Sequence, residues 1–350
     1  MISNYLLILI TSLIISFLLT PAVKKLAEFI NAVDIPGKRR INKIPIPNIG
    51  GLAIYASFVF TALIFLEINK TLIGILIGGS LITFIGLIDD KYEISPLWKL
   101  IGQISAAIIL IIFGIKIDFI TNPLGGLVYL GNWSIFFTII WVVSMTNVVN
   151  LMDGLDGLAA GVSIIAVITL FFVSLQEGQF LTASMAIALA GSTTGFLYFN
   201  FHPADIFMGD SGSMFLGYIL AAISIVGALK SAAAVTLVVP VLALGVPIFD
   251  TIFAIVRRLY NNKPIAKADN GHIHHRLLAL GWSQLEATLI VYGISVFLGL
   301  TALIVNGSSI EVSIFLILFV VIGIIFGAWR IGIFDVNLHS EKNQVEESKL

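Results

Sequence analysis

Continuous apolar runs recur along almost the whole of this 350-residue chain, and 58% of its residues are hydrophobic. A run of about 20 such residues spans a bilayer as a helix, and only helices or closed barrels satisfy every backbone polar group in lipid. Because the runs are continuous rather than alternating, they favour helices. We therefore predict an all-α polytopic integral membrane protein with about eleven transmembrane helices. The predicted spans cover residues 2–21, 47–66, 71–88, 98–117, 133–152, 156–175, 179–200, 211–229, 232–256, 286–305 and 311–330.

The segments between these runs are short, which favours a single domain. We expect one membrane-embedded domain over residues 1–334, followed by a polar and flexible cytoplasmic tail at 335–350. Residues 118–132 combine Pro and Gly with the segment Leu-Val-Tyr-Leu, which predicts a short hairpin outside the membrane.

The ninth span differs from the others because it contains helix breakers. Pro240, Gly245 and Pro247 all lie inside residues 232–256. A proline removes a backbone donor and kinks a helix. We therefore expect a kinked or broken ninth helix, with Asp250 near its inner end.

Lysine and arginine predict the orientation, because they are enriched in cytoplasmic loops. Placing the loops 22–46 and 257–285 inside puts 16 of the 19 basic residues on the cytoplasmic side and leaves only Lys70, Lys116 and Lys230 outside. This arrangement predicts an N-terminus outside and a C-terminus inside.

Composition also excludes several classes of partner and site. The chain has no cysteine, so disulfides and thiolate metal sites are excluded. A net charge of −1 without a basic run gives no sign of nucleic-acid binding, and the lipid bilayer is the expected surroundings. The pairs Gly74-x-x-x-Gly78 and Gly323-x-x-x-Gly327 would permit helix packing in a homodimer.

Four polar segments interrupt the apolar runs. They cover residues 86–99, 147–157, 202–213 and 262–276. With eleven crossings, all four fall on the same face of the membrane. Acidic, amide and imidazole groups gathered at one face predict a metal-assisted reaction on a polar substrate.

The first polar segment carries adjacent carboxylates. Asp89 and Asp90 repel each other, and desolvation near the membrane increases that cost, which a divalent cation or a shared proton would relieve. Lys99 lies one helical turn into the next span and would either reach the headgroups or bind a phosphate. We favour the phosphate.

The second segment, NVVNLMDGLDG, places amides and acids three residues apart: Asn147, Asn150, Asp153 and Asp156. This spacing predicts that they follow one side of a helix end. Their oxygens are hard ligands of the kind that magnesium binds. Gly157 would let the backbone approach a bulky ligand.

The third and fourth segments add a carboxylate, an aromatic ring and a cluster of cations. Asp210 begins another span and would serve as a helix cap or a metal ligand, while Phe207 would stack on a base or pack at the membrane interface. The segment 272–276, HIHHR, offers donors that suit a diphosphate better than zinc.

These motifs together resemble the polyprenyl-phosphate N-acetylhexosamine-1-phosphate transferases, integral-membrane enzymes that start bacterial cell-envelope glycans. KIPIPNIGG, LIDD, NVVNLMDGLDGLAAG, FMGDSGS and GHIHHRL follow in the family's order over essentially the whole chain. Because Ile273 interrupts the histidines, the last motif is similar to the branch that uses UDP-N-acetylglucosamine. The branch that uses UDP-N-acetylmuramoyl-pentapeptide typically has three consecutive histidines and stays an alternative.

The resemblance implies a role for each matching position. It implies catalytic functions for Asp89, Asp90, Lys99, Asp153, Asp156 and Asp210. It implies metal binding by Asn150 and Asp210, with Mg²⁺ as the ion and Mn²⁺ as a possible substitute. Substrate binding is implied for Lys43, Asn147, Gly157, Leu158, Phe207, His272, His274, His275 and Arg276.

The reaction implied is transfer of N-acetylglucosamine 1-phosphate from UDP-N-acetylglucosamine to undecaprenyl phosphate, with release of UMP. Asp89 or Asp90 would take a proton from the lipid phosphate, and a double displacement through an aspartate stays open. The implied location is the bacterial plasma membrane, with the active site facing the cytoplasm.

Two other classes fit less well. An ion-coupled transporter would carry its acids along a path through the bilayer, whereas these acids cluster at one face. A CDP-alcohol phosphotransferase requires arginine where Gly161 stands and a later acidic pair that the sequence lacks.

Overall fold

The computed structural model describes residues 2–35, 44–121, 126–230, 238–260, 271–330 and 332. The helices are α1 (Ile2–Phe29), α2 (Gly51–Phe65), α3 (Lys70–Tyr92), α4 (Pro96–Ile112), α5 (Trp133–Met152), α6 (Leu158–Gln176), α7 (Phe180–Asn200), α8 (Gly209–Lys230), α9 (Val238–Ala243), α10 (Gly245–Tyr260), α11 (Ile273–Ala279), α12 (Gln284–Asn306) and α13 (Ile310–Arg330). The strands are β1 (Val33–Asp34), β2 (Ile46–Pro47), β3 (Phe119–Thr121) and β4 (Leu127–Tyr129). The predicted tail, 335–350, lies outside the described residues.

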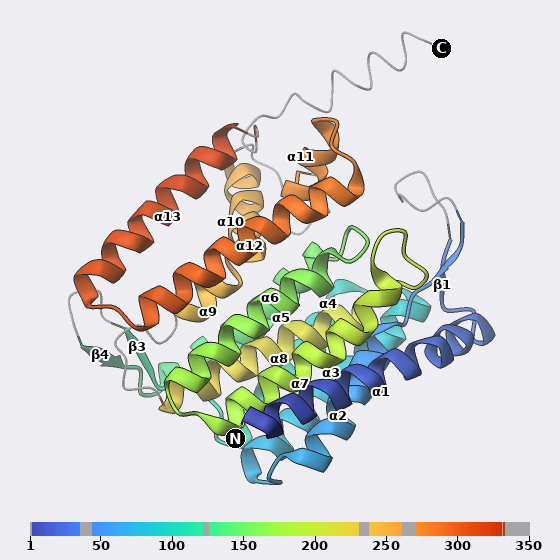
Figure 1. Ribbon diagram of the computed structural model, residues 1–350, viewed down its shortest axis with the longest axis horizontal. Coiled ribbons are helices and arrows are strands. Elements are labelled where there is room, and N and C mark those ends of the chain that lie inside the picture. Colours follow the sequence, from blue (N-terminus) through green and yellow to red (C-terminus); the bar gives the residue numbers. More distant parts are fainter. Residues whose placement is uncertain are drawn as a thin grey trace.

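Helices α1 to α8 form a bundle, and α9 to α13 lie along one side of it (Figure 1). Helix α8 is at the centre, is almost entirely buried, and packs against α2, α3 and α5. Its small residues allow close helix packing, since Gly212 lies against Gly51 and Gly217 against the backbone of Met145. Every polar segment that the structure describes therefore meets at the end where α8 begins.

The described part of the chain confirms an all-α membrane architecture but not the number of crossings. Eight of its helices are long and apolar enough to span a bilayer. Helices α2 and α4 are shorter, with 15 and 17 residues, and the ninth predicted span is divided. Each of the eleven predicted ranges nevertheless contains a helix.

One predicted boundary differs from the structure, and one predicted break is confirmed. Helix α1 does not end at Pro21 but continues to Phe29, because a membrane helix tolerates a proline whose freed carbonyl can be satisfied locally. The ninth span does break, at Leu244, between α9 and α10. Pro247 has no N–H to donate to the carbonyl of Ala243, so the helical ladder is interrupted there.

Two short strand pairs lie at opposite ends of the bundle (Figure 1). The predicted hairpin at 118–132 is confirmed, because β3 pairs antiparallel with β4. The second pair, β1 with β2, was not predicted from the sequence. Downstream of it, the backbone N–H groups of Gly50 and Gly51 donate to the carbonyls of Phe207 and Met208, at 2.9 and 2.8 Å. These bonds hold the start of α2 against the start of α8.

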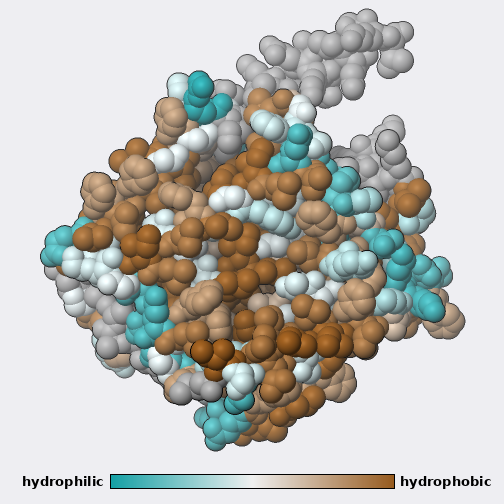
Figure 2. Space-filling view, in the orientation of Figure 1, coloured by the Kyte–Doolittle hydropathy of each residue, from teal (hydrophilic) through white to brown (hydrophobic). Residues whose placement is uncertain are grey.

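Hydrophobic residues cover the flanks of the helices, and hydrophilic residues gather toward the helix ends (Figure 2). Helix α13 shows this most clearly, because Phe315, Ile322 and Phe326 are each at least 60% exposed. Such a flank suits lipid rather than water. The first predicted packing pair faces inward, with Gly74 against Phe113 and Gly78 against Tyr218, so it is used within the chain.

Candidate active site

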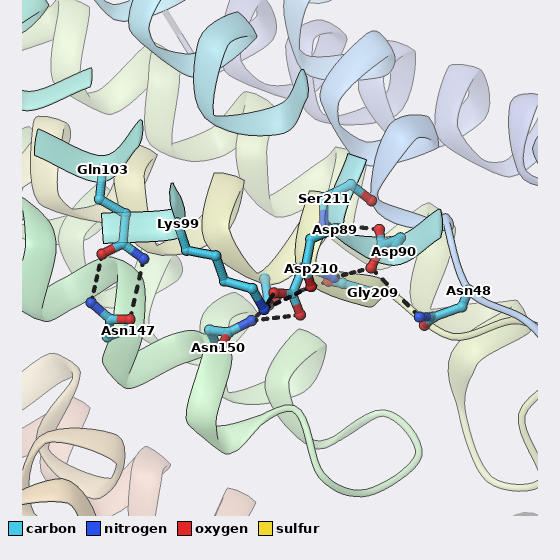
Figure 3. A network of polar contacts seen from close by, with 11 residues as sticks. Asn48, Asp89, Asp90, Lys99, Gln103, Asn147, Asn150, Gly209, Asp210 and Ser211 are labelled. Carbon is cyan, nitrogen blue, oxygen red and sulfur yellow. Dashed lines mark hydrogen bonds and ion pairs between the residues drawn. The ribbon is translucent and has the colours of Figure 1, made fainter. Parts of the chain in front are cut away.

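Lys99 joins two carboxylates from two other helices. Its Nζ lies 2.7 Å from Oδ2 of Asp89 on α3 and 2.5 Å from Oδ2 of Asp210 on α8 (Figure 3). Asp89 is buried, while Lys99 and Asp210 are partly exposed. A single ammonium group therefore offsets two negative charges at the membrane-proximal ends of α3, α4 and α8.

Asp90 holds the backbone of Asp210 in place at the start of α8. The N–H of Asp210 donates to Oδ1 of Asp90 at 2.6 Å, and the N–H of Ser211 donates to Oδ2 at 3.1 Å (Figure 3). Asp90 thus caps a helix that begins about 120 residues later, where backbone donors have no intrahelical partner. Gly209 makes this approach possible, because it has φ +70° and an added Cβ would lie 2.6 Å from both oxygens of Asp90.

The two adjacent aspartates therefore have different environments. Both oxygens of Asp90 accept backbone hydrogen bonds, and the amide of Asn48 lies 3.5 Å from one of them. Oδ2 of Asp89 faces Lys99, while its Oδ1 is buried and has no partner among the described residues. Asp89 is the member of the pair with unused acceptor capacity beside Lys99.

Asn150 completes the cluster from the end of α5. Its Nδ2 donates to Oδ1 of Asp210 at 3.0 Å and to Oγ of Ser213 at 2.9 Å. We call Asp89, Asp90, Lys99, Asn150 and Asp210 the carboxylate cluster. Its members come from α3, α4, α5 and α8. Figure 3 shows Asp89, Lys99, Asn150 and Asp210 pointing toward one another.

Asn147 lies one helical turn below Asn150 and has a different partner. Its Nδ2 donates to Oε1 of Gln103 at 2.7 Å, and Nε2 of Gln103 donates back to Oδ1 of Asn147 at 3.1 Å (Figure 3). This reciprocal amide pair joins α4 to α5 about one helical turn along α4 from Lys99. Asn147 therefore faces a neighbouring helix in this structure.

The acids after α5 lie on a turn, which corrects the prediction that they continue one side of the helix. Helix α5 ends at Met152, Asp153 is its C-cap, and Gly157 has φ +71°. Asp156 accepts from Nδ1 of His202 at 2.7 Å and from the N–H of Ala204 at 3.1 Å. The turn orients Asp153 and Asp156 toward the same cavity, although the helix that was expected to carry them has already ended.

A cavity of about 750 Å³ opens beside the carboxylate cluster. Residues of three of the four polar segments line it, and the predicted site residues among them are Asn150, Asp153, Asp156, Phe207, Asp210 and His275. The residues that the sequence did not single out include Asp34, Asn48, Asn200, His202 and Gln284. Acidic, amide, imidazole and aromatic groups thus converge on one space large enough for a nucleotide sugar.

Asp153 has the clearest electrostatic signature outside the membrane-spanning segments. Burial raises the pKa of Asp153 to about 7, with smaller contributions from the charges of Asp210 and Asp156. Near neutral pH its carboxyl group is therefore present in both protonation states. When protonated, it can donate a hydrogen bond to an acceptor in the cavity.

The histidines form a second group, on α11 and at its start, which we call the histidine cluster: His272, His274 and His275. His275 lines the cavity. His274 is buried, and burial, followed by the charges of His275 and His272, holds its pKa well below the usual range. Its Nε2 would lie 2.6 Å from a Cβ added to Gly154, a residue of the cavity wall. His274 therefore supports the wall from behind as a neutral ring.

Several predicted substrate residues lie behind the cavity wall or outside the description. Leu158 is buried at the start of α6, and the carbonyl of Gly157 accepts from the hydroxyl of Tyr292 at 2.6 Å. Arg276 is buried with the histidines. Lys43 lies outside the described residues.

Some residues with clear structural roles were missed because they carry no local signal. Ser213 and Asn48 are ordinary polar residues whose partners lie far away in the sequence. His202 could have been found, because it is an isolated imidazole at the start of the polar segment 202–213. Asp250 was noticed only for its depth in the ninth span.

The donor set suits an ion that needs few protein ligands. In the ranges that the structure describes, no three His, Cys, Asp or Glu side chains form a group able to hold a metal. The cluster nevertheless offers oxygen atoms of Asp210 and Asn150 at the cavity, and the unpartnered Oδ1 of Asp89 close by. Mg²⁺ commonly binds through one or two carboxylates together with substrate phosphates and water, so these residues fit it.

Known proteins give an independent view of this site. The family model for glycosyl transferase family 4 matches residues 72–228. The chain is 41% identical, over 317 residues, to a probable undecaprenyl-phosphate N-acetylglucosaminyl 1-phosphate transferase of Bacillus subtilis, covering 89% of this chain and 88% of the relative. It is 37% identical, over 314 residues, to a decaprenyl-phosphate N-acetylglucosaminephosphotransferase of Mycobacterium leprae, covering 81% and 79%. It is 34% identical, over 263 residues, to a phospho-N-acetylmuramoyl-pentapeptide-transferase of Thermoanaerobacter, covering 71% and 80%.

Proposed function

Because the chain belongs to glycosyl transferase family 4, a family of polyprenyl-phosphate sugar-phosphate transferases, we propose that it uses UDP-N-acetylglucosamine and undecaprenyl phosphate. The products are undecaprenyl-diphospho-N-acetylglucosamine and UMP. The observation that carries this proposal is the placement of Lys99 between Asp89 and Asp210, beside a cavity lined by acids and an aromatic ring.

The choice of donor rests on two observations. The relatives named for N-acetylglucosamine transfer are more similar to this chain than the relative named for muramoyl-pentapeptide transfer. Ile273 also separates His272 from the other two histidines, the form that is similar to the branch using UDP-N-acetylglucosamine. Both observations favour N-acetylglucosamine as the sugar.

The geometry supports a direct displacement. Asp89 accepts the proton of the acceptor phosphate, and the freed oxygen attacks the β-phosphorus of the donor. The bond from this phosphorus to the bridging oxygen breaks, and UMP leaves with that oxygen and the electron pair. Lys99 offsets the charge of the phosphates that meet beside it. An aspartyl nucleophile is less suitable, because Asp90 and Asp210 already use their oxygens in hydrogen bonds or ion pairs.

The nucleotide is proposed to occupy the cavity on the side of the acidic turn. Phe207 offers an aromatic face for the base, and such stacking contributes about 1–3 kcal/mol. Asp153 and Asp156 provide carboxyl groups for the ribose and uracil. His275 lies at the cavity wall, where it can donate to the diphosphate.

A magnesium ion is proposed to be held by Asp210 and Asn150, with Asp89 nearby. When bound, it would supply Lewis-acid stabilisation of phosphate charge. The carboxylate cluster contains three aspartates and one lysine, so a further positive charge would stabilise it.

The polyprenyl tail is proposed to lie against α10. Two apolar cavities, of about 320 and 370 Å³, flank this helix, one toward α5 and the other toward α12 and α13. The site end is proposed to face the cytoplasm of a bacterial plasma membrane, since Arg257, Arg258 and Lys91 lie at that end. A homodimer is not required by this site, which a single chain provides.

The decisive experiment uses purified protein in detergent with radiolabelled UDP-N-acetylglucosamine and undecaprenyl phosphate. We expect a lipid-linked sugar and UMP without any ion gradient, and loss of product in excess chelator that added Mg²⁺ restores. Labelled UDP-N-acetylmuramoyl-pentapeptide should give no lipid product. Product from the pentapeptide donor alone would identify the other branch, and no transfer from either donor would contradict the proposal.

Sidedness can be tested on one helix. The chain contains no cysteine, so Leu280→Cys and Ser309→Cys place single thiols at the two ends of α12. We expect an impermeant maleimide added to intact cells to label position 309 and not position 280. The reverse pattern would place the active site outside.

A further inference from the structure

One carboxylate of the broken ninth span is bonded to the beginning of the histidine cluster. Asp250 lies on α10 and is only 5% exposed. Its Oδ2 accepts from Nδ1 of His272 at 2.8 Å, and its Oδ1 accepts from the N–H of Ile273 at 2.8 Å. His272 is itself 6% exposed and is the N-cap residue of α11. Asp250 thus fixes both a side chain and the backbone at the point where α11 begins.

The three histidine rings connect this anchor to the cavity. The ring of His272 is parallel to that of His274, with 5.8 Å between centroids and 2° between planes. The ring of His274 contacts His275, with centroids 4.2 Å apart. His275 lines the cavity, so a shift of His272 is transmitted through two ring contacts to the place proposed for the diphosphate.

The middle ring has little else to hold it. Both ring nitrogens of His274 are buried and without a hydrogen-bond partner among the residues that the structure describes. Its position is therefore set by packing against its two neighbours and against Gly154. A hydrogen-bonded His272 gives this stack a directional constraint that packing alone does not supply.

Helix α10, which carries the anchor, is not embedded in the main bundle. It starts at the break in the ninth span, and apolar cavities lie on two of its sides. The cavity of about 370 Å³ includes Asp250 and Ile273 in its lining, so the anchor borders the space proposed for the lipid tail. Asp250 is thus one of the contacts between α10 and the start of α11, together with Arg257, which lies against Gly271.

We propose that Asp250 is a positioning residue of the transferase: it fixes the tautomer and orientation of His272, and through the ring stack it sets the position of His275 at the cavity. The inference rests on the proposed function. A carboxylate that accepts from Nδ1–H keeps that nitrogen protonated and leaves Nε2 as the other hydrogen-bonding atom of the ring. The same carboxylate holds α11 in register with α10.

Asp250→Asn separates the effect on the His272 ring from the effect on the backbone of Ile273. The amide oxygen can still accept from the N–H of Ile273, but the amide nitrogen would donate to Nδ1 of His272 and favour the opposite tautomer. We expect kcat to fall about 10- to 100-fold, while KM for UDP-N-acetylglucosamine changes less than threefold. Thermal stability should change little, because the isosteric side chain retains the backbone bond.

A double-mutant cycle with His272→Asn distinguishes positioning from general stabilisation. If Asp250 acts through His272, then adding Asp250→Asn to His272→Asn should cause no further loss of kcat. Additive losses would overturn the inference, and so would wild-type activity in Asp250→Asn. Asp118→Asn is the control, because Asp118 is also bonded, to Lys116 and Ser134, but lies at the other end of the bundle.

The remaining outcomes are also decisive. If Asp250→Asn does not fold, Asp250→Glu takes its place in the cycle, since it keeps the charge and changes the geometry. Failure of both variants to fold would make Asp250 a folding residue and refute the positioning role. Absence of transfer by the wild-type protein would instead contradict the proposed function, so the two failures can be told apart.

Discussion

The carboxylate cluster and the histidine cluster face the same cavity but are built differently. The first is carried by long helices that pack directly on one another, and its members are bonded across four helices. The second is carried by a seven-residue helix and is connected to α10 through Asp250. We therefore expect the side built by the long packed helices to be rigid, and the side built by the short helix to be more adjustable.

This difference suits a reaction between two anions of very different size. The phosphates must meet at a fixed arrangement of charge, which the packed helices provide before any substrate binds. We expect the side that is proposed to hold the donor's diphosphate, and that borders the proposed lipid cavities, to adjust to each substrate. Substitutions should therefore act mainly on chemistry in the carboxylate cluster and mainly on positioning in the histidine cluster.

The largest effect is expected for Asp210→Asn, which removes the charge that Lys99 and Asn150 contact. We expect kcat to fall about 1,000-fold, as for loss of a preorganised charged contact at a reacting phosphate. The radiolabel assay measures it, and an unchanged melting temperature shows that folding is retained. Turnover within tenfold of wild type would show that the carboxylate cluster is not the reaction centre.

Gly209→Ala should cause the next largest loss of kcat, because it would displace the backbone that positions the carboxylate cluster. The added methyl would lie 2.6 Å from both oxygens of Asp90 and would force a positive φ on alanine. Displacing Asp210 by about 1 Å should lower kcat about 100-fold. Gly293→Ala is the matched control, since nothing lies within 4 Å of its added Cβ. Equal activity of the two variants would contradict the hypothesis that the carboxylate cluster is rigid.

Gly154→Ala tests the histidine cluster by the same kind of change. Its Cβ would lie 2.6 Å from Nε2 of His274 and would push the ring stack. Because this side can adjust, we expect a loss of only about tenfold in kcat/KM, measured over a range of donor concentrations. A loss as large as that of Gly209→Ala would mean that both sides are equally rigid.

The smallest effect concerns stability rather than turnover. Burial raises the pKa of Asp153 to about 7 from an ordinary value of 3.8, so the folded protein binds this proton more tightly than the unfolded chain. That contribution to stability is complete below pH 3.8 and is lost as pH rises to 7 and above. Relative to Asp153→Asn, the wild-type melting temperature should therefore fall by a few degrees between pH 5 and 8. Parallel melting curves over that range would show that Asp153 titrates normally.

Much of the architecture followed from local patterns. Apolar runs predicted helices in all eleven ranges. Pro240 and Pro247 predicted that the ninth span would be kinked or broken, and it breaks at Leu244. Pro21 gave the opposite result, because α1 continues through it. A proline's effect depends on whether neighbouring groups can satisfy the freed carbonyl, and that is a property of the packed bundle.

The polar motifs identified the members of the site but not their contacts. The sequence placed Asp89 and Asp90 together as equals, whereas in the fold Asp90 caps the start of α8 and Asp89 lies against Lys99. Likewise, Asp250 and His272 are 22 residues apart, and no local pattern pairs them.

The sequence by itself determined the membrane character, the polar segments and the residue types available for phosphate chemistry. Those properties depend on composition and on spacing within one helix or turn. The tertiary structure alone decided which carboxylate caps a helix, which faces the lysine, and which histidine reaches the cavity. These assignments depend on contacts between helices that are far apart in the chain. The burial and hydrogen bonding of each side chain there are set by both helices together.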